Sequence, residues 1–181
     1  KNTVNSIIAQ IKQVYDLNVK IGIVIGGGNI FRGANGAALG LERANADYMG
    51  MLATVMNGIA LRDFLNNVGI KSRVYSAIAV ANIVKGYNRD SMLKNLDDGH
   101  VVIFVGGTGN PFFSTDSGAA LRAIEMNADL LIKATKVDGV YDCDPKENLT
   151  ATKYHKLSFD EAIKHNLKVM DMAAFDLCRS N

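Results

Sequence analysis

Two spacings of apolar residues alternate along the chain, one typical of helices and one typical of buried strands. Apolar side chains recur three and four positions apart over residues 7–15, which predicts a helix up to about Asp16. The next run, KIGIVIGGG over residues 20–28, is short, β-branched and closed by glycines, so it predicts a strand followed by a loop. Further helices are expected from an N-cap at Asn45 to about Gly69, over 88–100 with an end at Gly99, over 114–127 and over 158–166. Further strands are expected over 71–76, 101–105 and 128–135.

The expected strands are almost entirely apolar and alternate in sequence with the helices. That combination favours a parallel sheet with helices on both faces, hence an α/β fold. With 181 residues the chain can bury a sizeable core, and we expect one domain over residues 1–181. Ligands of such sheets bind just past the carboxyl ends of the strands, and two glycine-rich loops occupy that position.

Composition narrows the function classes. Hydrophobic residues make up 48% and charged residues 21% of the chain, which is typical of a globular protein. The net charge of +2 is scattered, so we expect neither a nucleic-acid-binding arm nor a membrane-binding basic patch. No apolar run reaches the roughly 18 residues of a membrane span. Cys143 and Cys178 match no metal or redox spacing, which favours a reduced cytoplasm.

The first glycine loop, GGGN over residues 26–29, comes directly after the first predicted strand and favours binding of an anion. It is not a Walker A loop, because no Gly-Lys-Ser/Thr follows at the required distance. Backbone N–H groups of Gly26, Gly27 and Gly28 can approach a ligand closely, and Arg32 could add a forked donor for phosphoryl oxygens. The alternative is a tight turn followed by a solvated arginine.

The second glycine loop lies between the strand over 101–105 and the helix over 114–127. It is an incomplete dinucleotide-binding motif, since Phe112 replaces the third glycine. Hydroxyl and amide groups accompany the glycines. An acidic residue lies near each loop, Asp47 for the first and Asp116 for the second, and could take hydroxyl protons or bind ribose hydroxyls. Either could instead simply stabilise the first turn of its helix through the dipole.

A third polar segment, KATKVDGVYDCDPKE over residues 133–147, combines an Asp-Gly turn with several carboxylates. A calcium loop is excluded, because Glu147 stands where the sixth loop position needs glycine. The segment is either a surface turn or a nucleotide-facing loop in which Tyr141 packs on a base. His100, His155 and His165 form no metal-ligand spacing.

Four segments together resemble the bacterial uridylate kinases (UMP kinases) of the amino-acid kinase family, in the same order and over essentially the whole chain. They are IGGGNIFRG, ADYMGMLATVMNG, GTGNPFFSTDS and KATKVDGVYDCDP. The resemblance implies a three-layer α/β/α sandwich and transfer of the ATP γ-phosphoryl group to UMP, giving UDP and ADP in pyrimidine nucleotide biosynthesis. It also implies Mg²⁺ carried with ATP, a cytoplasmic location, and a homohexamer activated by GTP and inhibited by UTP.

The resemblance further assigns site residues. The UMP site would comprise Gly27, Asp47, Thr108, Gly109, Asn110, Pro111, Phe112, Phe113, Ser114 and Thr115. The ATP site would comprise Gly28, Arg32, Thr135, Tyr141 and Asp144. Arg32 and Asp116 are the expected catalytic residues, and no side chain is expected to bind a metal directly. We expect Asp171 to cap a helix rather than to organise the site.

The sequence departs from the family pattern at both ends. A strand with a lysine-containing glycine segment precedes the opening helix in the family, and further strands close it; both are missing here. We therefore expect residues 1–181 alone to be inactive and poorly folded. Three alternatives remain: a family member that phosphorylates a carboxylate or carbamate, a non-catalytic nucleotide binder of the same fold, and a Rossmann oxidoreductase.

Overall fold

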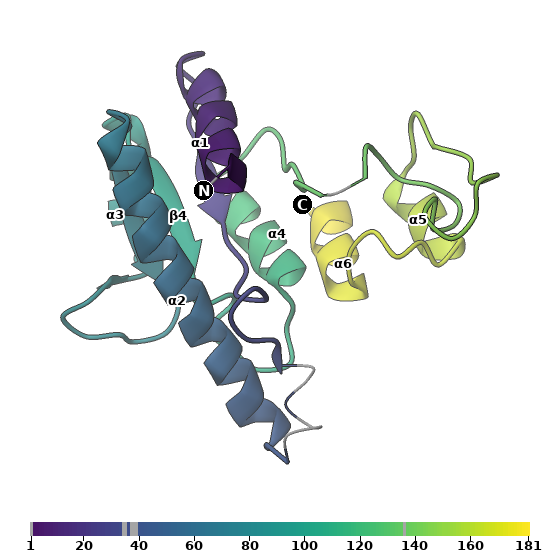
Figure 1. Cartoon of the computed structure of the whole chain (residues 1–181), viewed down its shortest axis with the longest axis horizontal. Helices are drawn as coiled ribbons and strands as arrows, with labels where there is room; N and C mark the ends of the chain where they lie inside the picture. Colours follow the sequence, from purple (N-terminus) through teal and green to yellow (C-terminus); the bar gives the residue numbers. More distant parts are fainter. Residues whose placement is uncertain (1, 34–35, 37–39, 136) are drawn as a thin grey trace. The chain divides into compact units, whose positions relative to one another are not determined.

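The computed structural model describes residues 2–33, 36, 40–135 and 137–181. The backbone forms two compact units, Lys1–Thr115 and Asp116–Asn181; Figure 1 labels their helices and the strand β4. The expectation of one domain stays a prediction. Of the helices in the described part of the chain, none has both the length and the apolarity that a membrane crossing requires.

The first unit is built on a parallel sheet. Its elements are α1 (Asn2–Tyr15), β1 (Gly22–Val24), α2 (Arg43–Asn67), β2 (Ser72–Ser76), β3 (Lys85–Gly86), α3 (Arg89–Asp97) and β4 (Val101–Val105). The strand order is β1-β4-β2-β3 and every pairing is parallel. The prediction of a parallel sheet is confirmed.

Side chains on the two faces of the sheet contact different helices. Val101, Ile103 and Val105 of β4 lie in one buried cluster with Leu65 of α2 and Ile8 of α1. These alternate positions of a strand share one face, so α1 and α2 cover that face.

The opposite face carries α3. Tyr75 of β2 is 1% exposed, and its hydroxyl oxygen accepts a hydrogen bond from Nδ2 of Asn95 of α3 at 2.8 Å. Tyr75 alternates along β2 with Val74, which belongs to the first cluster. The resulting layers are helix, sheet and helix, in agreement with the predicted three-layer α/β/α fold.

Helix boundaries follow the expected signals, with one exception. Gly69 and Gly99 follow α2 and α3 with φ of 82° and 75°, as expected for glycines that end helices. The predicted N-cap Asn45 is wrong: α2 begins at Arg43, and Glu42 is the N-cap with extended backbone. Asn45 instead lies in the first helical turn, where its amide donates to Glu42 Oε2 at 3.3 Å.

The second unit contains α4 (Thr115–Glu125) apart from its first residue, α5 (Phe159–Lys164) and α6 (Met172–Ser180). Ala162, Leu167 and Phe175 form its buried cluster. A capping box between Ser158 and Glu161 begins α5 and confirms that helix.

The predicted strand over residues 128–135 is wrong, because the structure assigns these described residues to no strand. Leu130 and Ile132 are 72% and 74% exposed. Apolar, β-branched composition favours extended backbone, but a strand also needs a neighbouring strand to pair with.

Candidate functional site

The two glycine loops of the first unit lie at the same edge of the sheet. The first follows β1 and the second follows β4, and these strands are parallel neighbours with Gly22 opposite Val102. A Cβ atom on Gly26 would lie 3.8 Å from Oγ1 of Thr115, so the first loop reaches the end of the second. This is the edge at which open parallel sheets bind ligands.

Gly27 allows the first loop to pack directly on α2. A Cβ atom at this position would lie 2.6 Å from the carbonyl oxygen of Gly50 and 2.8 Å from Cβ of Ala53. The Gly27 carbonyl accepts hydrogen bonds from the backbone N–H groups of Ile30 and Phe31, both at 2.9 Å. The loop is therefore a tight turn held against a helix.

Arg32 lies over this turn. Its Nε donates to the carbonyl oxygen of Gly28 at 3.2 Å, and the side chain is exposed. The guanidinium therefore lies beside the glycine loop, which is where the sequence predicts an additional hydrogen-bond donor for an anion.

The second loop turns on Gly106 and Gly109, with φ of 78° and 86°. A Cβ atom on Gly109 would also lie 2.9 Å from the carbonyl oxygen of Ala77, so both conformation and space require glycine there. Oγ1 of Thr108 accepts from the Asn110 N–H and donates to the Asn110 carbonyl, both at 3.2 Å. These bonds fix the loop before its aromatic residues.

Asp47 connects α2 to the aromatic part of the second loop. Its side chain is 12% exposed, and Oδ2 accepts from the backbone N–H of Phe112 at 2.8 Å and from Nε of Arg43 at 2.9 Å. The Arg43 guanidinium lies 5.7 Å from the centre of the Phe112 ring. Phe112 and Phe113 are 69% and 54% exposed, and Pro111, Ser114 and Thr115 complete the predicted UMP segment.

In the second unit, Asp116 lies in the first turn of α4 and pairs with a lysine that the sequence analysis did not select. Nζ of Lys133 lies 2.7 Å from Asp116 Oδ2 and donates to the Val169 carbonyl at 2.5 Å. Lys133 comes from the segment wrongly predicted as a strand, and nothing in the spacing of the sequence pairs it with Asp116. The structure therefore adds a cation beside a predicted catalytic carboxylate.

Tyr141 also has neighbours that the sequence analysis missed. Its hydroxyl donates to Asp138 Oδ1 at 2.7 Å, and Nζ of Lys153 donates to Asp138 Oδ2 at 2.9 Å. The hydrogen bond from Lys153, followed by that from Tyr141, lowers the pKa of Asp138 below its ordinary value. The hydrogen bond to Asp138 in turn raises the pKa of Tyr141.

The two other predicted ATP residues, Thr135 and Asp144, lie on either side of Asp138 and Tyr141 in the sequence. Asp144 Oδ1 accepts from the Lys146 N–H at 2.9 Å and so shapes a turn, while Thr135 is exposed. Asp171, expected to be a helix cap, is the N-cap of α6 and accepts from the Ala174 N–H at 3.0 Å. It also accepts from the Ser117 hydroxyl at 2.9 Å.

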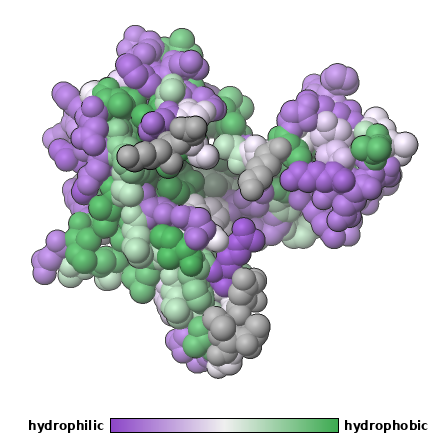
Figure 2. Space-filling model, viewed as in Figure 1, coloured by the Kyte–Doolittle hydropathy of each residue, from purple (hydrophilic) through white to green (hydrophobic). Residues whose placement is uncertain are grey.

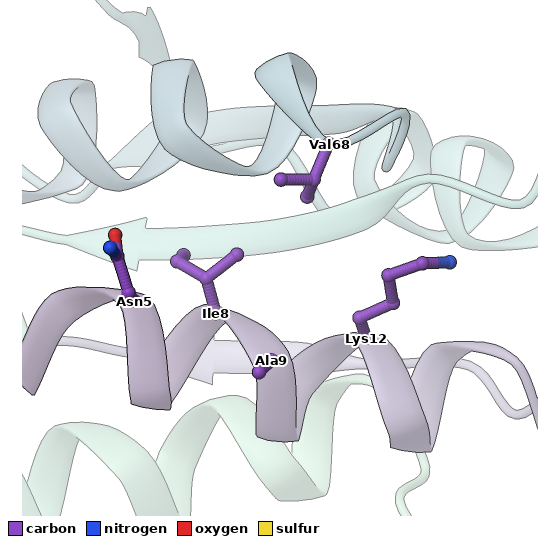
Figure 3. Close-up of a pocket in the computed structure, with 5 residues that line it drawn as sticks. All are labelled: Asn5, Ile8, Ala9, Lys12 and Val68. Atoms are coloured by element: carbon purple, nitrogen blue, oxygen red, sulfur yellow. The ribbon is translucent and has the colours of Figure 1, made fainter. Parts of the chain in front are cut away.

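A groove of a different kind lies near the amino ends of the strands. Figure 3 shows Asn5, Ile8 and Lys12 of α1 pointing toward Val68, which follows α2. Its lining is mainly apolar, and it contains none of the predicted site residues. Within the described ranges, no three His, Cys, Asp or Glu side chains are grouped so that they could hold a metal ion.

The fold and these loops define a class of protein. The chain belongs to the amino acid kinase family, whose family model matches residues 1–181. It is similar to the crystal structure of UMP kinase from Ureaplasma parvum, with 41% identity and a TM-score of 0.92, covering 98% of this chain and 76% of that one. It is also similar to UMP kinase from Bacillus anthracis, with 40% identity and a TM-score of 0.93, covering 98% and 73% of the two chains. It is therefore a UMP kinase homologue.

Proposed function

We propose that the protein transfers the γ-phosphoryl group of ATP to UMP and releases UDP and ADP, as a step of pyrimidine nucleotide biosynthesis. The observation that carries the proposal is the meeting of both glycine loops on α2, with Asp47 bonded to the second loop at Phe112. About 40% identity to two UMP kinases supports the choice of acceptor.

In this proposal the first unit binds the acceptor. The backbone of Gly27 contacts the UMP phosphate, and Asp47 accepts from ribose hydroxyls through lone pairs that remain beside its bond to Phe112. The residues from Thr108 to Thr115 surround the uridine. Arg32, which already lies over the first loop, compensates charge on the transferred group.

Phosphoryl transfer through a loose transition state depends on positioning and charge compensation more than on a strong base. We assign Asp116 the orientation of the reacting groups, with Lys133 holding its carboxylate at 2.7 Å. Gly28, Arg32, Thr135, Tyr141 and Asp144 would bind ATP. Bound Mg²⁺ would neutralise charge on the ATP phosphates, which would themselves hold it, in keeping with Mg²⁺ sites that rely on substrate phosphates.

We further propose a cytoplasmic homo-oligomer, a hexamer by resemblance, that GTP activates and UTP inhibits. Apolar surface on α2 supports assembly: its exposed apolar residues include Tyr48, Met49, Leu52, Met56 and Phe64. Figure 2 shows hydrophobic surface on the part of this face where α2 lies. Light scattering on the full-length protein tests the oligomeric state, and titration of GTP and UTP during turnover tests the regulation.

The acceptor is tested by measuring ADP release by the full-length protein with ATP and Mg²⁺. The acceptors compared are UMP, CMP, acetylglutamate and none. Release that depends on UMP supports the proposal. Release with acetylglutamate favours a carboxylate kinase of the same family, and nucleotide binding without turnover favours a non-catalytic binder; either result contradicts the proposal.

A further inference from the structure

One turn of α2 makes side-chain hydrogen bonds to both glycine loops. Thr54 is 5% exposed, and its Oγ1 accepts from the backbone N–H of Gly106 in the second loop at 2.7 Å. The same hydroxyl donates to the Met51 carbonyl within the helix at 2.6 Å. The hydroxyl proton is thus directed into the helix, which leaves the oxygen lone pairs to the loop.

Asn57 makes the corresponding contact to the first loop. Its Nδ2 donates to the carbonyl oxygen of Gly26 at 2.8 Å and to Oδ1 of Asn29 at 2.7 Å. Nδ2 of Asn29 donates back to Asn57 Oδ1 at 3.3 Å. One amide therefore holds the loop at both ends of its glycine run.

The spacing of these residues couples the two loops. Positions three apart lie on the same side of a helix, about 4.5 Å apart along its axis. The helix lies close to the sheet at this turn, because the space that a Cβ atom on Gly58 would need is already filled by Cγ1 of Val105, the last residue of β4. Movement of one loop relative to the other would therefore break one of the two side-chain contacts.

We infer that Thr54 and Asn57 are positioning residues that set the distance between the two glycine loops, and hence the geometry of the acceptor site. This inference rests on the proposed function for its kinetic consequence. Neither residue needs to contact the nucleotide. A misplacement of about 1 Å in a phosphoryl-transfer site can cost roughly a hundredfold in rate, so small loop shifts matter.

The test uses the full-length protein and paired variants. Thr54→Val keeps the shape of the side chain and removes the hydroxyl, whereas Thr54→Ser keeps the hydroxyl. Asn57→Ala removes the amide from the first loop. Asn66→Ala is the matched control on α2, because its Oδ1 accepts from Ser72 N–H and Oγ at 3.1 Å, at the opposite end of the strands from the loops.

Amide hydrogen exchange provides a readout that is independent of activity. Thr54→Val should speed exchange of the Gly106 amide by about tenfold, and Thr54→Ser should restore it. Asn57→Ala should speed exchange in peptides that cover residues 26–31. Asn66→Ala should lower the melting temperature and leave both loops unchanged.

Kinetics provide the second readout. Thr54→Val and Asn57→Ala should each lower kcat/KM for UMP by about tenfold or more, while KM for ATP changes by less than about threefold. If both variants leave loop exchange unchanged, or if Asn66→Ala disturbs the loops and UMP kinetics equally, the inference is wrong. If the unmodified protein does not phosphorylate UMP, the proposed function fails, and the exchange experiment still decides whether the two residues hold the loops.

Discussion

Asp47 Oδ2 accepts the backbone N–H of Phe112 at 2.8 Å across 65 positions of sequence. Phe112 has φ of 70°, and the other four described non-glycine residues with positive φ are asparagines, which tolerate that conformation. A bulky side chain in this region is strained. The bond from Asp47 offsets part of that strain, so the carboxylate supports the loop as well as the contact proposed for ribose.

Asp47→Ala should weaken the binding of UMP far more than the binding of ATP. The KM for UMP should rise by roughly tenfold or more, and the KM for ATP by less than about threefold. The reason is that the variant loses both the support of Phe112 and the ribose acceptor. Asp47→Asn separates the two effects, because its carbonyl oxygen can still accept from Phe112. Steady-state kinetics with each substrate varied in turn measure both constants, and an equal loss for both substrates would remove Asp47 from its assigned role.

Gly27→Ala should destabilise the protein by roughly 1–3 kcal/mol, since the new Cβ would lie 2.6 Å from the Gly50 carbonyl oxygen and must displace the loop or α2. Gly86→Ala is the control, because a Cβ there meets nothing within 4 Å. Urea unfolding followed by circular dichroism gives both values. Comparable stability for the two variants would mean that the first loop does not pack tightly on the helix.

Much of the fold could be predicted because local patterns agree with the tertiary structure. β4 is apolar in sequence and buried throughout, and Gly69 and Gly99 mark helix ends by their own conformation. The segment over 128–135 has the same apolar character, yet it forms no strand among the described residues. An apolar, β-branched composition favours extended backbone, whereas strand pairing also needs a neighbouring strand, which the local sequence does not specify.

The site also contains residues that could be predicted from the sequence and residues that could not. Both glycine loops and Asp171 could be recognised, because each acts next to a predicted strand end or helix start. Lys133 and Asn57 could not, since their partners Asp116 and Gly26 lie 17 and 31 positions away. In the sequence, Asn57 is a single polar residue within an apolar helical run, which indicates no partner. Its role depends on which turn of α2 faces the loop.

Asp116→Asn should lower kcat by about a hundredfold or more and leave KM for UMP within about threefold, because the change removes a charge that orients the reacting groups. Asp129→Asn is the control, an exposed carboxylate of the same unit. Single-turnover kinetics with ATP and UMP, with a melting curve for each variant, measure the effect. A loss that appears only in KM would place Asp116 in binding rather than in the chemical step.

The ion pair between Asp138 and Lys153 gives the last prediction, a pH-dependent contribution to stability. Because the pKa of Asp138 is lowered in the folded protein, chiefly by Lys153, its contribution is present above the ordinary carboxyl pKa near 4 and is lost as pH falls through the lowered value. In urea unfolding, the unmodified protein should therefore have a higher free energy of unfolding than Asp138→Asn at pH 7, and this difference should shrink toward pH 3. The exposed pair should also weaken in about 1 M salt. A difference in unfolding free energy that is equal at pH 7 and pH 3 would show that the charged Asp138 carboxylate does not stabilise the protein.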